Sequence, residues 1–394
     1  MSALRRRGRR RRGKRQPIKI LFLSANVGVG HVAAANAVVA ALRVDDPGVQ
    51  TSVVDSYEYA ALAMSRVVSE GYLQMVKTIP KMYGYMYRQA ERATEVGPFR
   101  LWAHQFTAGN LRPLMLEERP DAVVCTHAFP CGAMVEYKRA YPDAPPVVGV
   151  VTDFAVHAFW IHPEVDAYAV ATDAMRDVMI ARGIAPDRIA VTGIPVDPRF
   201  GAIAGSREAL RRRLDLPEDR KIVLMMGGGL GMGPIVTMMQ ALAGSREPVC
   251  AVVIAGRNAK LRTRVLAAAH GLDYPVRVLP FVDNVHEYMH AADVLLTKPG
   301  GLTTAEALVA GVPMVLFKPL PGQEERNVRY LTEKRAAVRA RTPADLERAV
   351  RELIEHPART EKMAAAVREI ARPDAAAEIA AIVRRLAARK EIAV

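Results

Sequence analysis

Short runs of β-branched and aliphatic residues alternate with longer helical stretches through most of the chain, starting at Ile18. A first series predicts strands at residues 19–23, 52–54, 122–125, 147–151 and 189–192. A second series predicts strands at residues 222–225, 251–254, 276–279, 294–296 and 314–317. Strands that are apolar on both sides, separated by amphipathic helices, are typical of parallel sheets covered on both faces. The sequence therefore predicts an α/β protein with two doubly wound, Rossmann-like domains that face a central cleft.

Glycine and proline concentrate in GIPVDPRFGAIAGS, residues 193–206, which predicts a domain boundary near residue 200. We expect an N-terminal domain over residues 17–200 and a C-terminal domain over residues 201–372. The stretch DAAAEIAAIVRRLAARK follows Pro373 and predicts a closing helix over residues 373–394. Ligands of such folds bind at the carboxyl ends of the strands, so we expect the site between the two domains.

Most of the net charge of +14 lies in one short segment. Residues 1–16 hold eight arginines, Lys14 and no acid, which leaves +5 for the rest of the chain. We expect a disordered Arg-rich tail that binds anionic lipid or nucleic acid, or that is simply solvated. The apolar run after it, residues 20–23, is too short for a secretory signal. The sequence also lacks the roughly 18 consecutive apolar residues of a spanning helix.

The first strand runs into a glycine turn in LFLSANVGVGH, residues 21–31. Gly28 and Gly30 permit a close backbone approach, and His31 then opens a helix of small residues. A helix N-terminus favours an anion or a developing negative charge. The third glycine of a dinucleotide fingerprint is missing. We therefore expect His31 to be catalytic, the alternative being an ordinary capped or exposed histidine.

A second glycine loop lies in MMGGGLGMG, residues 225–233. Backbone amides of such a loop, here at Gly228 and Gly229, are suited to face a diphosphate. No Lys-Ser/Thr pair follows, which excludes a P-loop of the Walker type.

A third motif, TKPGGLTTAEALV, occupies residues 297–309. Gly300, Gly301, Thr303 and Thr304 place amides and hydroxyls at a helix N-terminus, where phosphate oxygens bind. Glu306, one turn further, is positioned to accept hydrogen bonds from vicinal hydroxyls such as those of a ribose, or merely to favour the helix dipole.

The later PGQEERN places an amide and a carboxylate side by side in Gln323 and Glu324, a pairing suited to sugar hydroxyls.

Taken in this order, the motifs resemble the two-domain (GT-B) glycosyltransferases of family 28. KPGGLTTAEALVAGVP and KPLPGQE carry this resemblance. The segment VTDFAVHAFWIHPEVDAYAVATDAM is similar to diacylglycerol glycosyltransferases, which include processive β-glucosyltransferases and monogalactosyldiacylglycerol synthases. The resemblance covers roughly residues 19–331.

The resemblance implies a role for each matching position. His31 matches the general base on the acceptor hydroxyl, and Asp153 and His157 match positions that orient either His31 or the acceptor. Glu306 matches the ribose ligand, and Phe281 and Val282 fall where backbone groups hold the uracil. Gln323 and Glu324 match the pair that grips the hexose, and the glycines and threonines of residues 300–304 match the diphosphate turn.

The implied reaction is inverting transfer of glucose or galactose from a UDP-sugar to diacylglycerol, which makes a glycosyldiacylglycerol membrane lipid. No cofactor is expected, because the UDP-sugar is a substrate. No metal is expected, because an Asp-x-Asp signature is missing at a suitable place. Three cysteines have no metal-binding spacing and fit a reducing cytoplasm: Cys125, Cys131 and Cys250.

An enzyme that acts on diacylglycerol must reach a bilayer, so we expect peripheral attachment to an anionic membrane surface, on the cytoplasmic face of the cell membrane. Residues 57–106 interleave aromatic and basic side chains, as interfacial segments do. The candidates for acceptor or membrane contact are Tyr83, Tyr85, Arg88, Trp102 and His157.

Two alternatives stay open from the sequence. One is another UDP-sugar enzyme of the same fold, such as the N-acetylglucosaminyl transferase of peptidoglycan lipid synthesis or an epimerase. The other is a nucleic-acid binder that uses the Arg-rich tail, although the sugar-nucleotide motifs argue against a specific nucleic-acid partner.

Overall fold

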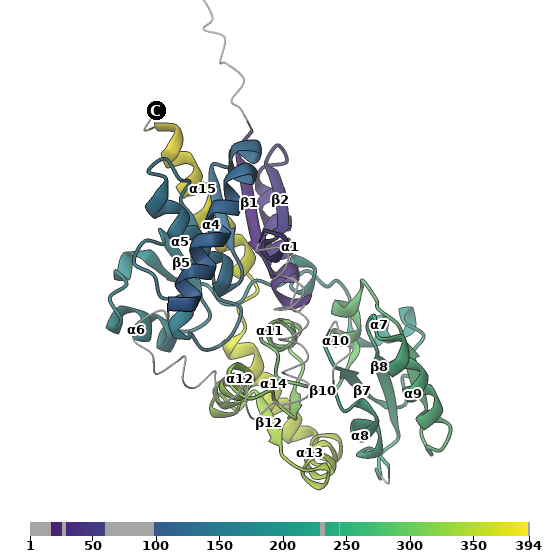
Figure 1. Cartoon of the computed structure of the whole chain (residues 1–394). Helices are drawn as coiled ribbons and strands as arrows, with labels where there is room; N and C mark the ends of the chain where they lie inside the picture. Colours follow the sequence, from purple (N-terminus) through teal and green to yellow (C-terminus); the bar gives the residue numbers. More distant parts are fainter. Residues whose placement is uncertain (1–16, 26–28, 60–97, 229–232, 244, 393–394) are drawn as a thin grey trace, which may run out of the picture.

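The computed structural model describes residues 17–25, 29–59, 98–228, 233–243 and 245–392. Two parallel six-stranded sheets form its framework (Figure 1). The first sheet contains β1 (Lys19–Ser24), β2 (Gln50–Asp55), β3 (Ala122–Cys125), β4 (Val147–Val150), β5 (Ala167–Val170) and β6 (Ile189–Val191). The second contains β7 (Lys221–Met226), β8 (Val249–Ile254), β9 (Val276–Leu279), β10 (Val294–Thr297), β11 (Met314–Phe317) and β12 (Ala337–Ala340).

Helices cover the sheets on both faces, as the buried strands require. Those that follow strands of the first sheet are α1 (Val29–Asp45), α4 (Pro98–Glu118), α5 (Ala128–Ala140) and α6 (Asp173–Ala181). The later helices are α7 (Arg207–Arg213), α8 (Ile235–Gln240), α9 (Ala259–Ala269), α10 (Val285–Ala291), α11 (Gly301–Ala310), α12 (Gln323–Glu333), α13 (Pro343–Glu355), α14 (Pro357–Ile370) and α15 (Ala375–Ile392). Within the described parts of the chain, none of these helices is long and apolar enough to cross a bilayer.

All ten predicted strands are present, and two further strands, β5 and β12, were not predicted. Each is only four residues long, with the sequences AYAV and AVRA. Alanine has a low strand propensity, so neither run stands out by composition. Both are strands because a paired neighbour lies beside them, β4 and β6 for β5 and β11 for β12.

The strand order places a point of reversed connection in each sheet. The first sheet runs β2-β1-β3-β4-β5-β6, so the chain leaves β1 on one side for β2 and returns on the other side for β3. The second runs β12-β11-β10-β7-β8-β9, which puts the same reversal between β7 and β10. Connections diverge at these two points, and ligands of such folds bind there, at the carboxyl ends of the strands.

The last helix returns to the first sheet. In α15 the buried residues recur with helical spacing: Ala376, Ile379, Ala380, Val383 and Ala387. They pack in one cluster with Val38 and Leu42 of α1. Arg384 of α15 also forms a 2.7 Å ion pair with Asp45 at the end of α1. Figure 1 shows α15, in yellow, beside the first strands although it is the last element of the chain.

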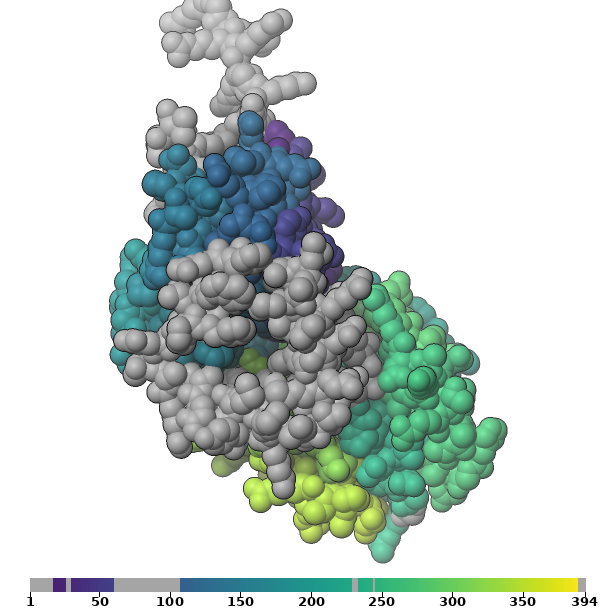
Figure 2. All heavy atoms as spheres, viewed as in Figure 1, coloured from purple at the N-terminus to yellow at the C-terminus, as the bar shows by residue number. Residues whose placement is uncertain are grey.

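The chain therefore passes between the two units twice. The first passage contains Gly193, whose φ is +94°, and the second contains Arg372. A Cβ added at Gly193 would lie 2.5 Å from Cβ of Arg372, so the two passages pack directly against each other. In the space-filling view, purple and blue residues lie in the upper part of the coloured surface, and green to yellow-green residues lie at its right and bottom (Figure 2).

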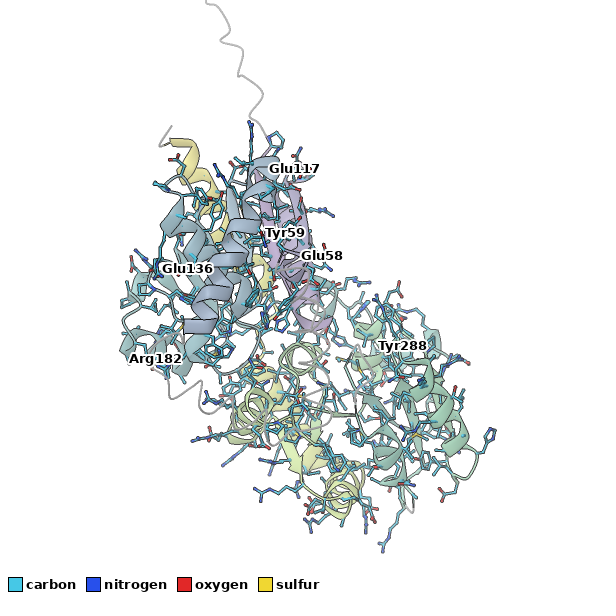
Figure 3. The ribbon with its side chains drawn as sticks, in the orientation of Figure 1. Glu58, Tyr59, Glu117, Glu136, Arg182 and Tyr288 are labelled. Carbon is cyan, nitrogen blue, oxygen red and sulfur yellow. The ribbon has the colours of Figure 1, made fainter. Side chains whose placement is uncertain are left out.

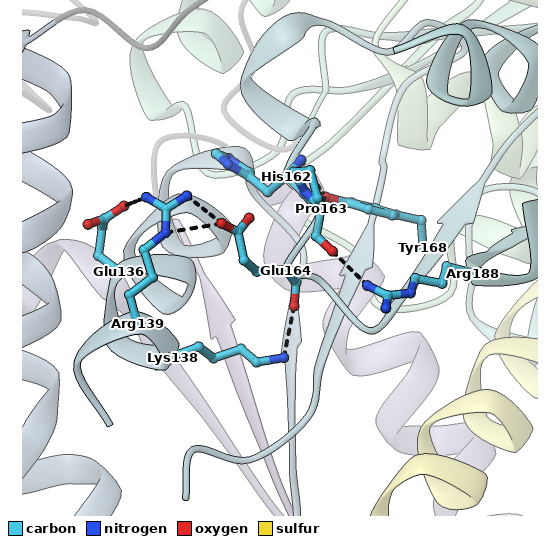
Figure 4. A network of polar contacts seen from close by, with 8 residues as sticks. All are labelled: Glu136, Lys138, Arg139, His162, Pro163, Glu164, Tyr168 and Arg188. Atoms are coloured by element: carbon cyan, nitrogen blue, oxygen red, sulfur yellow. Dashed lines mark hydrogen bonds and ion pairs between the residues drawn. The ribbon is translucent and has the colours of Figure 1, made fainter. Parts of the chain in front are cut away.

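A polar network pins the far end of the loop that follows β4. Lys138 of α5 donates to the carbonyl of Glu164 at 2.8 Å, and Arg139 binds the Glu164 carboxylate (Figure 4). Arg188 donates to the carbonyl of Pro163 at 2.6 Å. The buried Tyr168 hydroxyl donates to the carbonyl of Trp160, also at 2.6 Å. This anchoring matters because the same loop begins with residues of the candidate site.

Candidate active site at the interface of the two units

His31 lies at the reversal point of the first sheet. It is the third residue of α1, which begins just beyond the end of β1. Its Nδ1 lies 3.0 Å from the carbonyl oxygen of Thr126, the residue that follows β3. The same Nδ1 lies 3.0 Å from Oγ1 of Thr152, in the segment after β4. Three neighbouring strands thus contribute to the surroundings of one imidazole.

These contacts assign the proton of the ring. A carbonyl oxygen only accepts hydrogen bonds, so Nδ1 of His31 carries the hydrogen and donates it to Thr126. The neutral ring then holds its lone pair on Nε2, which is the form required of a general base. Burial lowers the pKa of His31 below its usual range, and the hydrogen bond to Thr126 opposes this shift. A lowered pKa keeps the ring neutral at neutral pH.

A second histidine, His127, lies against His31. His127 is the N-cap of α5, and its Nδ1 accepts a hydrogen bond from the backbone N–H of Phe129 at 3.2 Å. Its ring meets that of His31 edge-on, with 4.8 Å between the centroids. The ends of the strands are joined as well, because the Thr126 hydroxyl donates to Oγ of Ser24 at 3.1 Å.

The reversal point of the second sheet carries the glycine turns of the predicted donor site. Gly228 follows β7 with a φ of +73°, and Gly300 precedes α11 after β10. Lys298 lies between them: a Cβ added at Gly228 would be 3.5 Å from its Cε, and one at Gly300 would be 4.0 Å from its Nζ. Two turns from separate parts of the sequence thus surround one ammonium group.

The α11 residues differ in their surroundings. The Thr304 hydroxyl is buried and bonds to the carbonyls of Gly300 and Gly301 at 2.9 and 3.0 Å, so in this structure it serves the helix itself. Thr303 is partly exposed. Burial, with a contribution from the charge of Asp197, raises the pKa of Glu306 to about 8. A protonated carboxyl can both donate and accept hydrogen bonds.

Glu324 is already engaged at the start of α12. Its Oε1 forms a 2.7 Å ion pair with Lys298, and its Oε2 accepts from the backbone N–H of Leu320 at 2.8 Å. The neighbouring Gln323 is partly exposed. The predicted hexose-gripping pair is therefore brought to the same turn as the predicted diphosphate-binding residues.

The predicted uracil-binding positions follow β9 at the same edge of the sheet. Phe281 is 47% exposed, and the guanidinium of Arg257, which follows β8, lies 5.0 Å from the centre of its ring. Val282 is partly buried against the core.

The two reversal points meet at Gly301, the first residue of α11. A Cβ added there would lie 2.0 Å from the carbonyl oxygen of Thr152 and 2.9 Å from Oδ1 of Asp153. A side chain is excluded at such a distance, so the close approach of the two units requires a glycine. Figure 1 shows α11 beside the N-terminal end of α1, and a Cβ at Gly30 would be 3.6 Å from Cβ of Leu302.

Asn327 of α12 fastens this contact and is fully buried. Its Oδ1 accepts from the backbone N–H of Phe154 at 2.9 Å. Its Nδ2 donates to Oδ1 of Asp153 at 2.9 Å and to the carbonyl of Pro299 at 3.0 Å. The Phe154 ring also stacks on Tyr330 of α12, with 4.8 Å between the centroids.

Asp153 is thus bound to Asn327, and the oxygen that contacts His31 belongs to its neighbour Thr152. Burial raises the pKa of Asp153 to about 7; the hydrogen bond from Asn327 acts in the opposite direction. The Asp153 carboxyl group is part of the contact between the two units. Orientation of His31 by Asp153 stays a prediction.

His157 lines a pocket of about 370 Å³. Most of its walls are apolar, from residues 154–158 and from Ala174, Met175 and Val178 of α6. Arg182 and Arg326 complete the lining. Figure 3 labels Arg182 just beyond the C-terminal end of α6.

Several predicted residues lie outside the described residues: Gly229, Tyr83, Tyr85, Arg88 and the whole of the Arg-rich tail. Trp102 falls on α4. Among the residues that are described, no group of three or more His, Cys, Asp or Glu side chains is arranged to hold a metal ion.

Sequence reasoning missed four residues that the fold brings to the site: Thr126, Thr152, Asn327 and Lys298. Lys298 could have been predicted from the sequence, because it lies inside the TKPGG motif next to the predicted diphosphate turn. The other three give no signal in the sequence, because an isolated threonine or asparagine is common in any loop or helix.

Both units of the chain are similar to known protein families. Residues 31–196 match the monogalactosyldiacylglycerol (MGDG) synthase family, and residues 206–372 match the glycosyl transferases group 1. The chain is 31% identical over 366 residues to a processive diacylglycerol beta-glucosyltransferase of Bacillus cytotoxicus, a match that covers 93% of each chain.

Solved structures share the fold. MurG of Acinetobacter baumannii aligns with a TM-score of 0.61 at 19% identity, over 94% of this chain and 100% of that one. A UDP-GlcNAc 2-epimerase from Neisseria meningitidis aligns with a TM-score of 0.58 at 14% identity, over 94% and 100% of the two chains. These likenesses concern architecture, and they confirm the predicted GT-B fold. Since the sequence match to the B. cytotoxicus enzyme spans nearly the whole of both chains, this protein belongs to the family of the diacylglycerol glycosyltransferases.

Proposed function

We propose that the protein is an inverting hexosyltransferase that moves glucose or galactose from a UDP-sugar to diacylglycerol. One observation carries the proposal: a histidine held in the form of a general base and a glycine-lined turn around Lys298 lie at the two reversal points, which meet at Thr152 and Gly301. Family membership supports the acceptor and the transferred sugar, because the relatives are named diacylglycerol beta-glucosyltransferases.

In this reaction Nε2 of His31 takes the proton of the acceptor hydroxyl as the oxygen attacks the anomeric carbon. The bond from that carbon to UDP breaks on the opposite face, which inverts the configuration. UDP leaves with its diphosphate facing the amides at the start of α11 and the ammonium group of Lys298. Preorganised donors and cations of this kind stabilise charge that develops on a leaving group.

The pocket beside His157 supports the proposal that diacylglycerol is the acceptor. Its walls are mainly apolar, which suits a hydrocarbon chain, and it opens next to the loop that begins at Thr152. We further propose that the protein visits the cytoplasmic face of an anionic membrane peripherally. The basic residues 1–16 would contribute about 1 kcal/mol per cation near the surface. Vesicle sedimentation with and without these residues, at low and high salt, tests this tether.

The boundary between the acceptor unit, residues 17–200, and the donor unit, residues 201–372, also stays our proposal, with residues 373–394 as the closing segment. It is supported by the positions of the sheets, since β6 ends at Val191 and β7 begins at Lys221.

A donor-by-acceptor matrix tests the function. Purified protein is incubated with UDP-glucose, UDP-galactose or UDP-N-acetylglucosamine, each with diacylglycerol vesicles or with the lipid-linked muramyl peptide. Mass spectrometry then identifies the lipid product. We expect transfer of one or more hexoses to diacylglycerol. Transfer of N-acetylglucosamine to the muramyl lipid, without turnover of either hexose donor, would replace this proposal by the peptidoglycan alternative.

His31→Ala separates chemistry from donor binding. The variant lacks the base and should lose at least about 100-fold in turnover, the usual contribution of general base catalysis. Its UDP affinity, measured by calorimetry, should stay that of the wild type. Lost UDP affinity would instead assign His31 to donor binding or to structure.

A further inference from the structure

Thr152 touches both halves of the site with different atoms. Its side-chain Oγ1 lies 3.0 Å from Nδ1 of His31. Its backbone carbonyl oxygen lies against the α-carbon of Gly301, where an added Cβ would be only 2.0 Å away. Thr152 is 5% exposed, so the surrounding protein holds it firmly between these two contacts.

The hydroxyl contact has a defined direction. Nδ1 of His31 carries the hydrogen because Thr126 presents a carbonyl to it. Oγ1 of Thr152 therefore accepts from the same N–H, which is shared between two oxygen atoms. When Nε2 takes a proton, the ring becomes a cation and Nδ1–H becomes a stronger donor, so both oxygens then stabilise the protonated ring.

The carbonyl contact depends on how the two units meet. Asn327 binds Asp153 and Phe154, the two residues that follow Thr152, and it also binds Pro299 just before the α11 turn. The position of Thr152 is consequently set by residues of the second unit, although its hydroxyl serves the base of the first.

We propose that Thr152 is a positioning residue that orients His31 and makes this orientation depend on the docking of the α11 N-terminus against the first unit. The inference rests on the proposed function, in which His31 is the base and the α11 turn binds the donor diphosphate. A base that is aligned only in the docked state avoids catalysis before the donor half is in place.

Other titratable groups lie on the elements packed around His31. Among the described residues they include His127 at the start of α5, Tyr57 beside His127, Asp153 beside Thr152, Glu306 on α11 and Asp197 in the passage between the units. Asp153 and Glu306 titrate near pH 7 and pH 8, so activity profiles alone mix several ionisations. The test therefore reads the His31 ring directly, by NMR of ¹³C-labelled histidine.

The first test compares Thr152→Val, which keeps shape but loses the hydroxyl, with Thr152→Ser, which keeps the hydroxyl. In Thr152→Val we expect His31 to titrate at lower pH and the acid limb of kcat/KM to move the same way. We expect kcat to fall about 10- to 100-fold, the effect of a misaligned reacting group, with UDP affinity unchanged. In Thr152→Ser, the His31 titration and kcat should both return to the wild-type values. Thr332→Val removes a hydroxyl from α12 that bonds within its own helix and serves as the control.

The second test breaks the contact from the other side. Gly301→Ala places a methyl group against the Thr152 carbonyl, so His31 in the UDP-free protein should titrate as it does in Thr152→Val. The double variant should move no further. Gly300→Ala is the matched control for the titration, because a Cβ there meets its nearest atoms only at 4.0 Å.

An unchanged His31 titration in Thr152→Val, or one moved to higher pH, overturns the proposal. So does a Gly301→Ala protein in which His31 titrates as in the wild type. If the wild-type protein transfers no hexose in the matrix above, the proposed function fails, whereas the titrations still decide whether Thr152 couples His31 to the α11 turn.

Discussion

At the scale of single residues, the proposed general base His31 has no carboxylate against its Nδ1 among the residues that the structure describes, although such a partner often orients a catalytic histidine. The oxygens against Nδ1 of His31 are a backbone carbonyl and a hydroxyl, both uncharged. A carboxylate at this place would raise the pKa of the ring, whereas neutral oxygens leave the effect of burial in control. The imidazole therefore stays unprotonated at neutral pH, ready to accept a proton.

Asp153 predicts a pH dependence of stability. Its pKa is raised from 3.8 to about 7 in the folded protein, mainly by burial. The folded state thus binds the proton more tightly than the unfolded state. The stabilisation is complete below pH 3.8 and is lost as the pH rises towards 7.

Asp153→Asn keeps the oxygen that accepts from Asn327 and removes the charge. We expect its gain in unfolding free energy over the wild type to be larger at pH 8 than at pH 4.5, measured by urea denaturation. Asp187→Asn, at an exposed aspartate, is the control. An equal difference at both pH values for Asp153→Asn would show that this carboxyl group is not buried at the contact.

Lys298 predicts a loss of donor affinity. Lys298→Met removes the ammonium group that lies between the two glycine turns, and charge-assisted contacts of about 1.5–3 kcal/mol correspond to roughly 10- to 100-fold in the Kd for UDP. Calorimetry measures this Kd, with Lys298→Arg expected to retain much of the affinity and the exposed Lys260→Met as control. Undiminished UDP binding by folded Lys298→Met would place the diphosphate elsewhere.

At the scale of elements, most residues of the candidate site lie near the starts of helices. α1, α11 and α12 each begin at the carboxyl end of a parallel strand, and each contributes one of the key residues near its start. Within each sheet the strand register aligns the residues that follow the strands: Leu23 near the end of β1 pairs with Cys125 at the end of β3, and Thr297 at the end of β10 pairs with Leu316 of β11. Residues that follow these strands are therefore level with each other at one edge of the sheet.

The α12 contact predicts the effect of removing Asn327. Asn327→Leu keeps the branched shape of the side chain but leaves the Phe154 N–H, the Asp153 carboxyl and the Pro299 carbonyl without this partner. Each buried group left unpaired costs about 1–3 kcal/mol. We expect a lower Tm and a larger radius of gyration in solution scattering, as the contact between the units weakens. Asn36→Leu, at an exposed position of α1, controls for the loss of an amide; if both variants behave alike, Asn327 has no special role.

At the scale of the whole molecule, the chain passes between the two units twice, and both passages join the units. α15 closes the hydrophobic face of the first sheet with residues from the far end of the sequence. The first unit is therefore incomplete until the second has been synthesised, and its stability depends on the last helix.

Val383→Asp tests this dependence. Val383 is fully buried against α1, and an unpaired buried charge should lower the free energy of unfolding by roughly 4 kcal/mol. Ala381→Asp, on the exposed face of the same helix, should change it little. Hydrogen exchange locates the loss, which we expect in α1 and β1 rather than in the second sheet. Equal stability of the two variants would mean that α15 is not part of the first core.

The sequence by itself determined the α/β class, ten of the twelve strands in the described part of the chain and the glycine turns at which phosphate and sugar groups are expected. These features are local: apolar runs, helix starts and glycines act on neighbouring residues, and a spacing of a few positions reveals them. The same locality explains the prediction of His31, which lies just after a strand and a glycine turn.

Only the tertiary structure decided what surrounds that histidine. Thr126 and Thr152 are 95 and 121 positions away from His31, and Asn327 is 174 positions from Asp153. Threonine and asparagine are ordinary residues anywhere in a sequence, and they matter here because parallel strands end at one edge and two sheets bring those edges together. Strand order and the docking of the two units set these contacts, and neither is encoded in any short stretch of the chain.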